Sequence, residues 1–114
     1  MTDRSATRPV VDVLYFQGCP NYADAFELVE QVCVQLGIDA EVRRREITSL
    51  QAAAEHRFLG SPTIQVNGRD VEPDAADRRD YTLACRVYRH HDRLAGQPDA
   101  RLVRQALTEA VSGA

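Results

Sequence analysis

The chain has 114 residues, 44% of them hydrophobic, which is enough for one domain with a single core. Its 14 basic and 17 acidic residues give a net charge of −3, without a basic face dense enough to bind nucleic acid or an anionic membrane. All 14 basic residues are arginine, and the absence of lysine excludes Schiff-base chemistry.

The first nine residues are polar, so we expect residues 1–9 to form a flexible tail and not a signal peptide or anchor. Residues 10–114 should form one domain. No apolar run reaches the length of a membrane span, and we expect a cytoplasmic protein. The odd number of cysteines, three, argues against a structural disulfide framework, so the thiols should be reduced.

Six of the seven residues in Val10–Phe16 are apolar or aromatic, which is typical of a strand buried on both faces. Apolar residues then recur at helical spacing over 22–36, and Gly37 is placed to end that helix. Cys19 therefore lies at a strand-to-helix junction. The unpaired N–H groups and partial positive charge of a helix N-terminus favour a thiolate there.

Residues 38–47 alternate at first and then become highly charged, which predicts an edge strand whose arginines 43–45 face solvent. Thr48 and Gln51 form a capping-box pattern, so a helix should run from Thr48 to Phe58 and end at Gly60.

Two short β runs over 63–71 are joined by Asn67-Gly68, the strongest hairpin signal in the chain. Residues 72–80 read as a loop and residues 90–96 as a turn. The segment YTLACRVY, residues 81–88, could be a strand, a helical turn or an ordered insertion. A last helix should start at Pro98 and Asp99.

This order predicts an α/β fold, β-α-β-α-β-β-α, with a four-stranded mixed sheet, helices on its faces and an insertion before the last helix. The order, with Cys19 at the first strand-to-helix turn and Ser61-Pro62-Thr63 directly before the hairpin, resembles the thioredoxin and glutaredoxin fold over residues 10–111.

The family's redox motif is Cys-x-x-Cys, whereas the matching residues here are Cys19-Pro20-Asn21-Tyr22, so only the first, nucleophilic cysteine carries over. By the same resemblance Pro62 matches the family's cis-proline, which lies beside the reactive sulfur and shapes where a substrate chain or thiol docks. The residues expected to contact substrate are Pro20, Tyr22, Ser61, Pro62 and Thr63. Tyr22 could equally be the first residue of the helix's apolar face.

More closely, GCPN, FLGSPT, NGRDVEP and Y-x-L-x-C-R-x-Y together are similar to small bacterial thioredoxin-like proteins, several of them named as relatives of alkylmercury lyase. An organomercurial lyase needs two thiols and a carboxylate around one metal. Asp24 and Asp80 are candidate carboxylates, although neither lies in a specific motif.

Cys19 is either a nucleophile or soft-metal ligand, or a small residue filling a tight turn. Cys33 lies in the apolar stripe of the first helix and should be a packed core thiol. Cys85 could be a resolving cysteine or second metal ligand, or part of a covering segment. His90, His91 and Asp92 read as a solvated loop, because no spaced partner cluster accompanies them.

The leading hypothesis is a thiol–disulfide exchange protein with a single reactive cysteine, Cys19, in place of the Cys-x-x-Cys pair. Cys85 is the second candidate catalytic residue, as the thiol that resolves the mixed disulfide. The protein's partner would be a disulfide, a small thiol such as glutathione, or a partner protein. One alternative is a soft-metal or organomercurial protein using the same two thiols. Another is a non-catalytic module that binds a partner around Pro62. No cofactor is indicated, because the chain has no glycine-rich phosphate loop and no zinc-site spacing.

Overall fold

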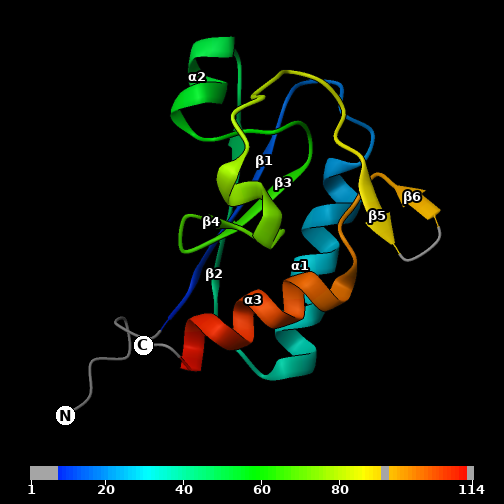
Figure 1. Cartoon of the computed structure of the whole chain (residues 1–114). Helices are drawn as coiled ribbons and strands as arrows, with labels where there is room; N and C mark the ends of the chain where they lie inside the picture. Colours follow the sequence, from blue (N-terminus) through cyan, green and yellow to red (C-terminus); the bar gives the residue numbers. More distant parts are fainter. Residues whose placement is uncertain (1–7, 91–92, 113–114) are drawn as a thin grey trace.

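A computed structural model describes residues 8–90 and 93–112 (Figure 1). Residues 1–7 of the predicted tail, together with His91 and Asp92, lie outside the described residues. The elements, in chain order, are β1 (Val10–Tyr15), α1 (Tyr22–Leu36), β2 (Glu41–Glu46), α2 (Leu50–Glu55), β3 (Thr63–Val66), β4 (Arg69–Asp70), the 3₁₀ helix η2 (Pro73–Asp77), β5 (Tyr88–His90), β6 (Arg93–Ala95) and α3 (Ala100–Ser112).

The main sheet has four strands in the order β2-β1-β3-β4. β1 and β2 are parallel and are connected through α1, whereas β3 runs antiparallel to both β1 and β4. The chain is therefore an α/β protein with a four-stranded mixed sheet, as the sequence predicted. Gly37 also ends α1 as predicted, with a left-handed φ of 66°.

The alternation of side chains along β1 divides the core between the two faces of the sheet. Val11 and Val13 pack with α1 and α3, which lie side by side (Figure 1). Leu14 points the other way and packs with Ala53 of α2 and with Phe58. β1 is thus the central strand, buried on both sides, and the turn that follows it emerges between helices of opposite faces.

The edge strand β2 differs in one respect from the expectation of a solvated arginine run. Arg43 makes a two-pronged contact with Asp12 of β1, at 2.8 and 3.1 Å, and Arg45 lies 3.4 Å from the same carboxylate. The Arg44 guanidinium lies 4.2 Å from the Phe26 ring centroid. The arginines therefore attach the edge strand to its neighbours, because Asp12 is the one charged residue of the central strand.

The predicted capping box at Thr48 is wrong by one residue. Ser49 is the N-cap of α2, and its hydroxyl accepts the Ala52 N–H at 3.0 Å. The helix ends at Glu55, earlier than predicted, and Arg57 takes the left-handed conformation that closes it. The Phe58 N–H then bonds back to the Ala53 carbonyl, which is the Schellman pattern.

Two further expectations need correction. The segment 72–80, predicted as a loop, contains η2, with Pro73 at its start. The segment 90–96, predicted as a turn, contributes to the antiparallel pair β5 and β6, in which Tyr88 faces Ala95. These strands are only three residues each, and half of their side chains are polar, so they are too short to show the alternating pattern by which a strand is found. Within the described part of the chain, no helix is long and apolar enough to cross a membrane.

Candidate functional site

Cys19 lies in the turn between β1 and α1, where the chain leaves the central strand. Its backbone N–H donates to the Phe16 carbonyl oxygen at 3.1 Å, which closes the turn, and the residue is 7% exposed. The thiol is free. Helix α1 begins at Tyr22 with Asn21 as its N-cap, so the cysteine lies just ahead of the helix N-terminus, as the sequence predicted.

The residues after Cys19 are held by packing. Tyr22 stacks on Tyr15 at the end of β1, with ring centroids 4.2 Å apart and planes 14° from parallel. The Asn21 side chain lies so close to Gly96 that a Cβ at that glycine would overlap it. Pro20 is exposed. Of the predicted contact residues on this turn, Pro20 is therefore free to meet a substrate, and Tyr22 has a packing partner.

Ser61, Pro62 and Thr63 lie at the same end of the sheet as Cys19. Thr63 pairs with Leu14, so the residues before β3 meet those that follow β1. The Ser61–Pro62 peptide bond is cis, as the resemblance implied. All three side chains are buried. They are inaccessible to a substrate in this conformation, which the sequence did not predict.

What buries them is the stretch of residues 82–88, here called the covering segment. Cys85 forms a parallel bridge with Ser61. The Ser61 N–H donates to the Ala84 carbonyl at 2.8 Å, and the Ser61 carbonyl accepts the Arg86 N–H at 2.9 Å. Of the three alternatives for residues 81–88, the ordered insertion is the one observed, up to the start of β5 at Tyr88. In Figure 1 it crosses the end of the sheet between η2 and β5.

Arg86 anchors the covering segment through a buried ionic cluster. Its guanidinium makes two hydrogen bonds to Asp70, at 2.7 and 3.0 Å, and one to Glu72, at 2.7 Å. It also donates to the Thr63 hydroxyl at 3.1 Å. Burial works against the charge of Arg86, but the hydrogen bonds to Asp70 and Glu72 outweigh it, and the pKa of Arg86 is raised. The cation is thus fixed in place.

Tyr88 is the second anchor of the covering segment. Its side chain is fully buried and its hydroxyl donates to the Pro62 carbonyl oxygen at 2.6 Å. Burial raises the pKa of Tyr88, so the phenol stays protonated and keeps this donor. The Arg86 guanidinium carbon lies 4.5 Å from the centre of the Tyr88 ring.

The three cysteines occupy different environments: Cys19 is buried in the turn after β1, Cys33 is buried in the core and Cys85 is exposed. Cys33 is packed in the core cluster of α1, as predicted, and burial, aided by Glu30 and Asp39, raises the pKa of its thiol. Cys85 is exposed on the covering segment, where it forms the isolated bridge with Ser61 and is followed by buried Arg86. All three thiols are free, so Cys19 and Cys85 are not joined by a disulfide.

The two candidate carboxylates for a metal, Asp24 and Asp80, have different surroundings. Asp80 pairs with Arg78 at 2.7 Å, and this hydrogen bond lowers the pKa of the carboxyl. Asp24 is exposed in the first turn of α1 and, with His90, lines a cavity of about 350 Å³. His90 is bonded to the Gln97 carbonyl at 2.6 Å. Over residues 8–90 and 93–112, no three His, Cys, Asp or Glu side chains gather as a metal site.

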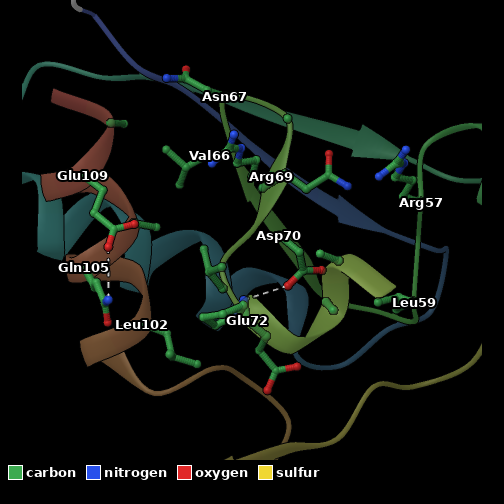
Figure 2. Close-up of a pocket in the computed structure, with 18 of the residues that line it drawn as sticks. Arg57, Leu59, Val66, Asn67, Arg69, Asp70, Glu72, Leu102, Gln105 and Glu109 are labelled. Carbon is green, nitrogen blue, oxygen red and sulfur yellow. Dashed lines mark hydrogen bonds between the residues drawn. The ribbon is translucent and has the colours of Figure 1, made fainter. Parts of the chain in front are cut away.

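A wider cleft of about 940 Å³ lies between α3, η2 and the β3–β4 hairpin. Figure 2 shows Leu102, Gln105 and Glu109 on one wall of this cleft and Asp70 and Glu72 beside them. Its lining includes none of the site residues predicted from the sequence. The cleft therefore does not form the surroundings of Cys19.

The Arg86 cluster was missed by sequence reasoning. Asp70 and Glu72 follow the hairpin turn, and nothing in their spacing relates them to an arginine 14 or 16 residues later. The alternating pattern R-V-Y within 81–88 was the available signal, because Arg86 and Tyr88 point inward while Val87 is exposed.

Comparison with known proteins yields no match, either to a family model or to a curated protein. The function is therefore argued from the site itself.

Proposed function

We propose that this chain is a thioredoxin-like thiol–disulfide exchange protein in which Cys19 is the single nucleophile. The observation that carries the proposal is the position of this free thiol, in the turn between the central strand β1 and the N-terminus of α1. A thiol at such a turn lies near the partial positive charge of a helix N-terminus. That charge favours the thiolate, which is the nucleophilic form of cysteine.

The topology supports the thioredoxin-like part of the proposal. The parallel strands β1 and β2 are connected through α1. The antiparallel hairpin of β3 and β4 completes the sheet on the other side of β1. α1 and α3 cover one face and α2 the other. The order is the one that the resemblance implies, with Cys19 at the family's reactive position and Pro62 at its proline position.

In the proposed reaction, the Cys19 thiolate attacks one sulfur of a disulfide. A bond forms between Cys19 Sγ and that sulfur, the original S–S bond breaks, and the other sulfur leaves with the electron pair as a thiolate. The product is a mixed disulfide on Cys19. Since residue 22 is tyrosine, no second thiol follows in the same turn to resolve it.

Cys85 is the candidate that resolves the mixed disulfide. It is exposed, and its backbone lies beside Ser61 at the same end of the sheet as the Cys19 turn. Attack by the Cys85 thiolate on Cys19 Sγ would form a Cys19–Cys85 disulfide and release the bound thiol. A small thiol such as glutathione would otherwise attack the bound sulfur, form a new disulfide with it and release Cys19 as the thiolate.

The test is mass spectrometry of the non-reduced protein after mild treatment with oxidised glutathione, comparing wild type with Cys85→Ser. We expect a Cys19–Cys85 disulfide in the wild type and a Cys19 glutathione adduct in the variant. A glutathione adduct on Cys19 in both proteins would leave the nucleophile in place and assign resolution to an external thiol. Cys19 unmodified in both would overturn the proposal.

A further inference from the structure

The edge of β3 near the site is covered by the chain's own backbone. β4 pairs with only Gln65 and Val66, so it does not extend along the beginning of β3. There the Ser61 N–H donates to the Ala84 carbonyl, and the Ser61 carbonyl accepts the Arg86 N–H. An open sheet edge is where an extended peptide adds a strand through its own backbone. The covering segment occupies that edge.

The covering segment is held at several points along its length. The Thr82 N–H donates to the Phe58 carbonyl at 3.1 Å at one end, and Tyr88 reaches Pro62 at the other. Between them the approach to Gly60 is so close that a Cβ there would lie 2.9 Å from Arg86 Cβ and 3.0 Å from the Ala84 oxygen. The segment therefore lies directly on the residues that precede β3.

The contact between the covering segment and Ser61 also buries polar atoms that would gain partners if the segment moved away. The Ser61 hydroxyl and Arg86 Nε are buried and find no hydrogen-bond partner among the described residues. Buried polar atoms without partners favour a state in which they reach water or another partner. The outer side chains of the segment, Cys85 and Val87, are exposed, so little packs on it from outside.

We propose that the covering segment, held by Arg86 and Tyr88, restricts Cys19 to small disulfides by excluding extended peptides from the Ser61 edge. This inference rests on the proposed function, since it concerns the substrate of the same thiol. A disulfide the size of oxidised glutathione needs only access to sulfur, whereas a peptide that pairs along the edge must first displace residues 84–86. Arg86 and Tyr88 are positioning residues that set this specificity.

The experiment compares two probes on Cys19, oxidised glutathione and a disulfide-linked peptide of about ten residues, the length of a long strand. All proteins carry Cys85→Ser, so that the mixed disulfide accumulates, and its rate of formation is followed by mass spectrometry. Tyr88→Phe and Arg86→Gln each remove an anchor, and the Tyr88 change is the gentler one, because it deletes a single hydroxyl. Hydrogen exchange at the Ser61 N–H reports the release of the covering segment.

With both anchors present, we expect the peptide to react about tenfold or more slowly than oxidised glutathione. Tyr88→Phe should speed Ser61 exchange and raise the peptide rate about fivefold, with the glutathione rate unchanged. Arg86→Gln should act in the same direction more strongly. Arg78→Gln is the matched control, because Arg78 pairs with exposed Asp80 and should alter neither rate.

Equal rates for the two probes with both anchors present would overturn the inference. So would unchanged Ser61 exchange in both anchor variants, or faster exchange without a faster peptide reaction. Cys33 is the internal check, because a variant that has merely unfolded would expose and modify this core thiol too. Failure of Cys19 to react with either probe in every protein would instead remove the proposed function.

Discussion

At the scale of single residues, Arg86 carries the most tightly specified contacts of the site. Its side chain is 2% exposed, and those of its partners Asp70 and Glu72 are 10% and 24% exposed. A buried ion pair is a weak source of net stability, since desolvation offsets its attraction, but removal of one partner leaves an uncompensated charge. The cluster thus fixes position more than it adds stability.

We therefore expect Arg86→Met to lower the free energy of unfolding by about 3–5 kcal/mol, because Asp70 and Glu72 are left without their cation. Urea denaturation followed by circular dichroism measures it. Arg78→Met is the matched control, and loss of its exposed pair with Asp80 should cost less than about 1 kcal/mol. Equal losses in the two variants would show that the cluster does not hold the segment.

At this scale the sequence predicted the position of Cys33 in the fold but not which residues bury the site around Cys19. Cys33 could be predicted as a core thiol because it lies on the apolar stripe of α1, a local pattern. The burial of Ser61 and Thr63 could not, because it depends on a segment more than 20 residues later in the chain. Contacts of that range leave no periodic signal.

At the scale of elements, the close approach of the covering segment depends on Gly60. This glycine has a φ of +119°, and a side chain there would meet both Arg86 and the Ala84 oxygen. Helix termination, the role predicted for Gly60, is performed by Arg57 instead. The glycine is needed for contact between two segments, which cannot be distinguished from a helix stop in the sequence alone.

Gly60→Ala should destabilise the protein more than Gly37→Ala, as measured by the midpoint of urea unfolding. Gly37 also has a positive φ, but a Cβ there meets nothing within 4 Å, so its substitution should cost only the backbone term of about 1–2 kcal/mol. Gly60→Ala adds the displacement of residues 84–86. Equal costs for the two substitutions would contradict the packing of the covering segment against residue 60.

The elements with strong local signals were predicted well. β1, α1 and the Asn67-Gly68 hairpin combine a clear hydrophobic period with defined ends, and all three are present. β5 and β6 were missed because three-residue strands offer no alternation to detect, and their position is fixed by the burial of Tyr88. Propensity identifies elements that are stable through their own pattern, not those held by tertiary contacts.

At the scale of the whole molecule, the site lies where the central strand β1 ends between the two layers of helices. The Cys19 turn comes from β1, Ser61–Thr63 from the start of β3, and residues 82–88 cross above them. The mixed sheet and its flanking helices could be predicted from the order of elements. The cover over one end of it could not, since residues 81–88 had no decisive pattern.

The measurement that tests the central claim most directly is a time course of native protein with oxidised glutathione, with each cysteine followed separately by peptide mapping. Cys33 is the built-in negative control, because it packs in the hydrophobic core, whereas Cys19, equally buried, lies in a turn beside exposed Pro20. We expect the Cys19 adduct or its disulfide with Cys85 to form under native conditions, while Cys33 reacts only after unfolding. Modification of Cys19 only on unfolding, together with Cys33, would show that it is a packing residue and contradict the account.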